Sequence, residues 1–122
     1  MDKVLFTYFQ HTDKDILISL SCDEESTFGV DGFLIQRTPP YEQALYPHER
    51  GACVEWDDSD DIPVLVDRVF LNRAELKVVT RGKVREYHFD ITAITDEEYQ
   101  ALVEHLRLIN FDDSFKMVIS RY

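Results

Sequence analysis

Alternating apolar and polar positions predict β-strands from the first residues of the chain onward. The segment 3–9 places Val4, Phe6 and Tyr8 on one face of an extended chain, and the segment 15–22 alternates more regularly. A period of two is typical of strands that bury one face and expose the other. The polar residues between the two segments, HTDKD, predict a turn.

Five more strands follow from the same pattern. Their segments are 32–37, 52–56, 62–72, 74–81 and 84–91. Asn72-Arg73 and Gly82-Lys83 separate the last three, and both pairs are compatible with tight hairpin turns. In the final strand Tyr87, Phe89 and Ile91 share one face, which predicts a sheet with one dry side that a helix should cover.

The segment 38–51, TPPYEQALYPHERG, interrupts this series of strands. Its three prolines and its glycine block ladder hydrogen bonds and predict a long loop. We expect Tyr41, Leu45 and Tyr46 to anchor this loop to the core.

A helix is predicted near the C-terminus. Thr95 is a natural N-cap and Glu98 completes a Thr-x-x-Glu capping box. Apolar residues then recur at helical spacing. They are Tyr99, Leu102, Val103, Leu106 and Ile109. Leu108 points away from this stripe, and the tail 111–122 is the nearest segment to cover it, either as a final strand or as a packed extension.

These elements predict a single α+β domain over residues 1–122. It comprises a mainly antiparallel sheet of six or seven strands, with one C-terminal helix at about 95–110 packed on one face. A chain of 122 residues can bury a core large enough to fold without a metal or a disulfide. We therefore expect Cys22 and Cys53 to be free thiols.

Location follows from what the sequence lacks. No apolar run approaches the roughly 20 residues that cross a bilayer, and the N-terminus does not resemble a secretory signal. We expect a cytoplasmic protein that does not enter a membrane.

Charge narrows the choice of partner. The chain has 13 basic and 24 acidic residues, for a net charge of -11. Such a surface repels phosphate backbones, so direct binding of nucleic acid is not expected. It attracts basic proteins and raises the rate of their association. The alternative is that the excess of acidic residues only keeps the protein soluble.

The densest acidic run directly follows Trp56. Its four aspartates are Asp57, Asp58, Asp60 and Asp61. An EF-hand that began at Asp57 would need glycine at its sixth position and glutamate at its twelfth, but Ile62 and Arg68 stand there. A solvated turn and a surface for a basic partner both remain consistent with the run.

Glu86, His88 and Asp90 alternate along one strand, so their side chains project from one face and resemble part of a metal site. No His-x-His or Cys-x-x-Cys motif supplies a further ligand, and an ordinary polar face explains the row better. The sequence also has no nucleophile elbow and no glycine-rich phosphate loop. We expect no enzyme activity and no cofactor.

Three stretches together resemble a known family. They are GFLIQR, CVEWDD and HFDITAITDEEYQALVEHLRLI, and the similarity covers about residues 32–110. The pattern resembles immunity protein family ten, small bacterial proteins encoded beside polymorphic toxins. The resemblance implies a protein that binds and neutralises a cognate toxin without catalysis. Because the binding surface in such families varies with the toxin, it assigns no residue.

The resemblance and the charge lead to one prediction. The aspartates at 57, 58, 60 and 61 bind a basic toxin, for example a nuclease, and Trp56 is an aromatic anchor beside them, although a strand tryptophan is more often core. Two alternatives stay open. One is a metal-binding protein or enzyme that uses Glu86, His88 and Asp90, and the other is an acidic housekeeping interaction domain. Oligomeric state does not follow from the sequence.

Overall fold

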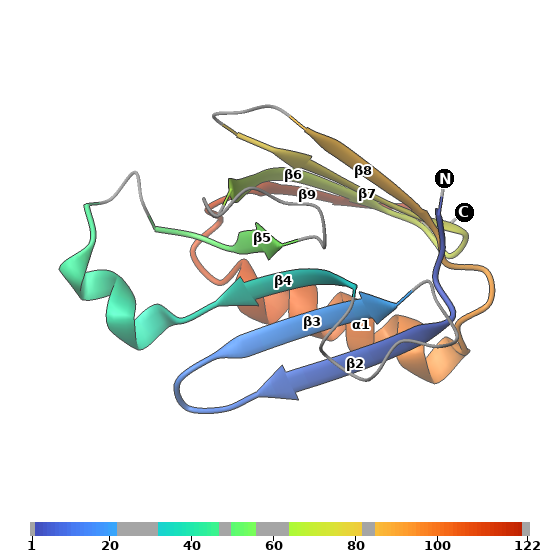
Figure 1. The fold of residues 1–122 in the computed structure, drawn as a ribbon, viewed down its shortest axis with the longest axis horizontal. Coiled ribbons are helices and arrows are strands. Elements are labelled where there is room, and N and C mark those ends of the chain that lie inside the picture. The colour runs from blue at the N-terminus through green and yellow to red at the C-terminus, as the bar shows by residue number, and fades with distance from the viewer. Residues whose placement is uncertain (1, 22–31, 47–49, 56–63, 82–84, 121–122) are drawn as a thin grey trace.

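The computed structural model describes residues 2–21, 32–46, 50–55, 64–81 and 85–120 (Figure 1). These residues form nine strands, one 3-10 helix and one α-helix. The elements are β1 (Asp2–Lys3), β2 (Phe6–His11), β3 (Ile16–Ser21), β4 (Phe33–Arg37), η1 (Pro39–Ala44), β5 (Cys53–Glu55), β6 (Val64–Leu71), β7 (Glu75–Thr80), β8 (Glu86–Asp90), α1 (Asp96–Ile109) and β9 (Lys116–Ile119).

The strands form one hydrogen-bonded sheet in the order β1-β8-β7-β6-β5-β4-β3-β2, and β9 lies beside β6. Two pairings, β1 with β8 and β6 with β9, are parallel, and the others are antiparallel. The predicted α+β class, with a mainly antiparallel sheet and one C-terminal helix, is confirmed. The strand number exceeds the six or seven expected because the N-terminal strand divides in two and residues 116–119 of the tail pair with β6.

The N-terminal segment divides because it changes partners. β1 pairs with β8, whereas β2 pairs with β3 at the other end of the strand order. Only Val4 and Leu5 separate the two strands, so the ends of the order lie close together and the sheet is strongly curled. The prediction that Val4, Phe6 and Tyr8 share a face is wrong. Val4 is buried, but Phe6 and Tyr8 are exposed, because the chain reorients where it changes partners.

The curl brings non-neighbouring strands face to face across the core. The ring of Phe33 in β4 lies 4.8 Å from that of Phe89 and 5.0 Å from that of Tyr87, both in β8. The predicted alternation in β8 is confirmed, since Phe89 and Ile91 are buried while Glu86 and His88 are exposed. One core cluster therefore joins both halves of the sheet and the helix.

Helix α1 begins at the predicted cap. Thr95 Oγ1 accepts from the backbone N–H of Glu98 at 3.1 Å, and Glu98 Oε1 accepts from the backbone N–H of Thr95 at 3.0 Å. Its apolar stripe, Leu102, Val103, Leu106 and Ile109, is buried against β2 and β3, and Figure 1 shows the helix behind these strands. Leu108 is half-buried at the edge of the core.

The hairpin predicted at Asn72 is confirmed. Asn72 Oδ1 accepts from the backbone N–H groups of Ala74 and Glu75, each at 2.8 Å, so the side chain closes the turn between β6 and β7. Cys53 is a free, half-buried thiol whose pKa is raised by burial, and Cys22 lies outside the described residues. No helix in the described part of the chain is long and apolar enough to span a membrane.

The long proline-rich segment departs from its prediction. Residues 39–44 form η1, and Tyr41 and Tyr46 are 60% and 70% exposed. With Leu45 also exposed, these side chains do not anchor the segment to the core. Glu42 is the residue of this segment that points inward, because the buried Arg37 supplies its counter-charge.

Candidate functional site

The predicted binding residues lie in the segment that connects β5 to β6. Trp56, Asp57, Asp58, Asp60 and Asp61 are all outside the described residues. The structure does describe the strand ends on either side of this segment, and these ends locate where it leaves and rejoins the sheet.

Four strand ends lie together at one end of the sheet. Three pairings connect them: Leu20 with Phe33, Leu34 with Glu55, and Val54 with Val64. The last residues of β3 and β5 therefore adjoin the first residues of β4 and β6. Neighbouring strands are about 4.8 Å apart, so these four ends span roughly 15 Å. We call this region, defined by Ser21, Phe33, Glu55 and Val64, the acidic end of the sheet.

The name reflects the sequence of the two segments attached there. Residues 22–31 contain four acidic residues and residues 56–63 contain four more, and neither contains a basic one. Together they carry eight of the 24 acidic residues, and -8 of the net charge of -11. Most of the excess negative charge is thus carried by two segments whose ends are both attached at one end of β3 to β6.

The polar row of β8 is paired with the neighbouring strand. His88 Nε2 lies 2.9 Å from Glu75 Oε2, and Glu86 Oε1 lies 3.3 Å from Lys77 Nζ. These are cross-strand pairs between β7 and β8 on the outer face of the sheet. In the part of the chain that the structure describes, no group of three or more His, Cys, Asp or Glu residues is arranged to hold a metal ion.

The most extensive polar cluster surrounds Arg37, the last residue of β4, which is 2% exposed. Its Nε and Nη2 donate to the two carboxylate oxygens of Glu42 at 2.8 and 2.9 Å. Nη1 and Nη2 donate to the two oxygens of Asp112, both at 2.8 Å. Each of the two carboxylates therefore accepts two hydrogen bonds from the same guanidinium.

Three further contacts complete the cluster. Arg37 Nη1 donates to the carbonyl of Ile109, the last residue of α1, at 2.8 Å and to Ser114 Oγ at 3.1 Å. The guanidinium carbon lies 4.3 Å from the ring centroid of Phe111. Arg37 thus joins β4, η1 and the end of α1.

Arg37 acts as a structural clamp because its donors are all engaged. Burial alone would lower the pKa of Arg37, but the hydrogen bonds to Asp112 and Glu42 outweigh burial and hold the pKa above its ordinary value. The guanidinium is therefore charged at every working pH and transfers no proton.

In the sequence, Arg37 stands out only as the last residue of GFLIQR, one of the stretches that carry the family resemblance. A signal for its burial was present, because Phe33, Ile35 and Arg37 alternate along β4 and all three point inward. What no local pattern indicates is the set of partners, which lie up to 77 residues away in sequence.

The clamp predicts a specific dependence of stability on pH. The hydrogen bond from Arg37 lowers the pKa of Asp112 to about 2, below its ordinary value, so the folded state favours the charged carboxylate. This stabilisation is present above about pH 4 and is lost as the pH falls towards about pH 2.

We expect Asp112→Asn to lower the free energy of unfolding by about 1 kcal/mol at neutral pH, a modest value because the side chain is 43% exposed. The difference from the unmodified chain should shrink as the pH falls from about 4 to about 2. Urea unfolding across this range measures it. Asp113→Asn is the matched control, because Asp113 has a φ of 54°, which asparagine tolerates. If the loss in the free energy of unfolding caused by Asp112→Asn stayed constant with pH, the ion pair of Asp112 with Arg37 would not be the source of the pH dependence.

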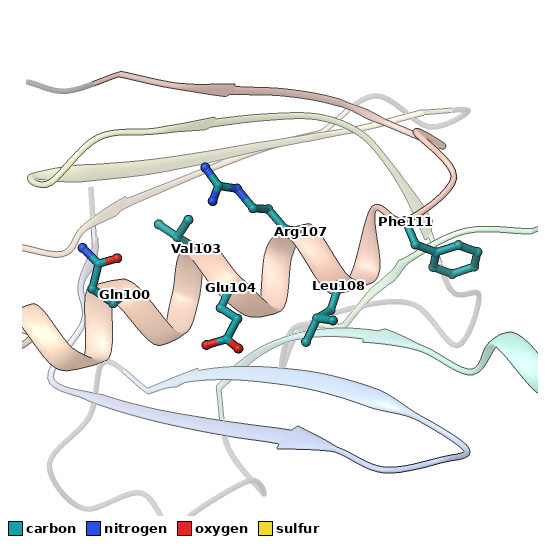
Figure 2. A pocket seen from close by; sticks show the side chains of 6 residues that line it. All are labelled: Gln100, Val103, Glu104, Arg107, Leu108 and Phe111. Carbon is teal, nitrogen blue, oxygen red and sulfur yellow. The ribbon is translucent and has the colours of Figure 1, made fainter.

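Concave regions are also present among the described residues. One, of about 640 Å³, lies where the tail enters β9 and includes Arg68, Lys116, Asp67 and Asp113, so its charges are mixed. Another, a groove of about 400 Å³, runs along the exposed face of α1 (Figure 2). Searches for similar proteins add no further site, since no known family, no curated protein and no solved structure matches the chain.

Proposed function

We propose that this chain is a binding protein of the immunity type, which neutralises a basic toxin by occupying its positively charged surface. The observation that carries the proposal is the location of charge. Segments holding eight acidic and no basic residues are both attached at the acidic end of the sheet. A nuclease must present a basic surface to its substrate, and a concentrated negative charge is complementary to it.

Concentration of charge matters because of screening. At physiological salt the Debye length is about 8 Å, so charges scattered over the whole molecule act on a partner separately. Charges on segments whose points of attachment span only roughly 15 Å can act on one partner surface together. Such an arrangement favours rapid, oriented association, which a neutralising protein requires.

A binding role also agrees with the use of the other polar groups. Arg37 and its carboxylates connect β4, η1 and α1, and the polar row of β8 pairs with β7. These clusters have structural explanations, so neither of them points to a reaction.

The proposal predicts the effect of removing charge at residues 57–61. We expect replacement of Asp57, Asp58, Asp60 and Asp61 by asparagine to slow association with the toxin by about tenfold or more at low salt. The protein encoded by the neighbouring gene is the first toxin to test, by surface plasmon resonance and by rescue of growth when the two are co-expressed. Urea unfolding of the variant checks that it remains folded.

A control variant removes the same number of charges outside the acidic end. It replaces Asp13, Glu86, Glu97 and Asp113, all exposed, by their amides. This variant should retain association within about threefold. Equal losses in both variants would mean that only net charge matters, as in the housekeeping alternative. No growth rescue by the unmodified chain would reject the neutralising role.

A further inference from the structure

The register of β2 to β5 aligns their side chains in rows that cross all four strands. Residues directly opposite each other in neighbouring strands point to the same face of a sheet. One row packs in or against the core and comprises Phe9, Ile18, Ile35 and Val54. Because side chains alternate along each strand, the rows on either side of this one point outward, away from the core.

We call these two outward rows the β2–β5 outer face. The first row comprises Tyr8, Ser19, Leu34 and Glu55, and the second comprises Gln10, Leu17, Gln36 and Cys53. In Figure 1, α1 lies behind β2 and β3, so this face is turned towards the viewer. The two rows are about 7 Å apart and each spans roughly 15 Å.

The β2–β5 outer face is almost free of charge. Seven of its eight residues are uncharged, and the exception, Glu55, belongs to the acidic end of the sheet. The other half of the same sheet differs, because the outer face of β7 and β8 carries cross-strand polar pairs. These pairs are Lys77 with Glu86 and His88 with Glu75. Depletion of charged residues is typical of the centre of a protein interface, whereas paired charges are typical of a solvated face.

Tyr8 is the large exposed side chain of this face, at 42%. Its hydroxyl oxygen lies 3.5 Å from Gln10 Oε1, so the two side chains lie side by side. Leu17 and Leu34, on the next two strands, are half-buried and add aliphatic surface. An exposed aromatic side chain on a strand, with aliphatic and amide neighbours, is typical of an interface anchor.

Charge decides which partner fits this face. Glu55 ends the row of Tyr8 and also belongs to the acidic end, so the two surfaces are continuous. A basic protein attracted to the acidic end is thereby brought over the β2–β5 outer face. A second copy would bring a second acidic end with it, and nucleic acid would bring phosphates, so both are repelled.

We propose that the β2–β5 outer face is the surface on which the basic toxin docks, with Tyr8 as its anchor and the amides of Gln10 and Gln36 as hydrogen-bonding groups. This inference rests on the proposed function and adds a second surface to it. The acidic end accelerates the encounter, and the uncharged face beside it slows dissociation. Together they have the usual anatomy of an interface, an uncharged centre with a charged border.

Replacement of the anchor separates the two surfaces kinetically. We expect Tyr8→Ala to raise the dissociation rate of the complex by about tenfold or more and to leave the association rate within about twofold. The aspartate variant at 57–61, in contrast, mainly slows association. Phe70→Ala is the matched control, because Phe70 is an aromatic residue of similar exposure, 37%, on the outer face of β6. It should leave both rates within about twofold. Surface plasmon resonance with the protein encoded by the neighbouring gene measures them.

A charge placed within the face gives a second, independent variant. Gln36→Lys puts a positive charge opposite a basic partner and should weaken binding by about tenfold or more. Val118→Lys adds the same charge on β9, where Val118 is 41% exposed beside Phe70, and should change affinity by less than about threefold. Urea unfolding of each variant checks that it remains folded. If Tyr8→Ala does not fold, Gln36→Lys decides the question.

The possible failures differ from one another. If Tyr8→Ala and Gln36→Lys dissociate at the rate of the unmodified chain while the aspartate variant associates slowly, the outer face is not part of the interface and the proposed function stands. If the unmodified chain does not bind the neighbouring protein, both proposals are rejected. Sedimentation equilibrium adds one more outcome, because self-association that Tyr8→Ala abolishes would assign the face to a second copy and overturn this inference.

Discussion

Arg37→Met is expected to lower the free energy of unfolding by about 3 to 5 kcal/mol, the range for breaking a buried ion pair by removing one partner. Methionine keeps most of the side-chain length but donates no hydrogen bond. Glu42, only 8% exposed, would keep a buried negative charge without its counter-charge, and the carbonyl of Ile109 would lose a donor. Because domains of this size are stable by only about 5 to 15 kcal/mol, much of the total would be lost. Urea unfolding at neutral pH measures the change.

A double variant distinguishes the clamp from a general packing effect. Adding Glu42→Gln to Arg37→Met removes the stranded charge, so the pair should lose less stability than the sum of the single changes. Arg68→Met is the control, because Arg68 is about half exposed and, among the residues that the structure describes, forms an ion pair with its neighbour Asp67 alone. It should cost less than about 1 kcal/mol. An Arg37→Met variant as stable as this control would refute the clamp.

Phe33→Ala is expected to cost about 3 to 5 kcal/mol, as for other fully buried aromatic residues. Phe33 is 0% exposed, and its ring contacts Phe89 and Tyr87 of a strand that is not its neighbour in the sheet. Removal of the ring would leave a cavity where the curled sheet meets itself. Denaturant unfolding measures the loss.

Two comparisons sharpen this second test. Phe33→Leu keeps most of the volume and should cost less than half as much as the alanine change. Phe70→Ala removes a ring that is 37% exposed on the outer face, and should cost about 1 kcal/mol or less. If Phe33→Ala were no worse than Phe70→Ala, the contact between β4 and β8 would not be a major source of stability.

Local patterns predicted the elements whose cause is local. The helix follows from Thr95, Glu98 and an apolar stripe, all within 15 residues. The hairpin at Asn72 follows from hydrogen bonds between the Asn72 side chain and the backbone N–H groups of Ala74 and Glu75. The alternation in β8 predicted its buried face because period two directly reports which side is dry. Predictions of this kind need no knowledge of the rest of the chain.

Predictions that depended on tertiary contacts were the ones that changed. Phe6 and Tyr8 lie outward because the chain leaves β8 for β3 after Val4, and this change of strand partner is not visible in the local pattern. Tyr41 is exposed because its neighbour Glu42 turns inward to pair with the buried Arg37. In both cases the burial of a partner, and not the local apolar pattern, decided which side chains face the core.

The same division applies to the candidate site. The amino-acid sequence alone established the acidic run at 57–61, the net charge of -11, the α+β class and the capped helix, because each depends on residue type and short-range spacing. Only tertiary structure brought the ends of two acidic segments to one end of the sheet, enclosed Arg37 between two carboxylates and left the α1 groove open. The physical reason is that strand pairing and burial join residues tens of positions apart, and no local periodicity encodes which of them meet.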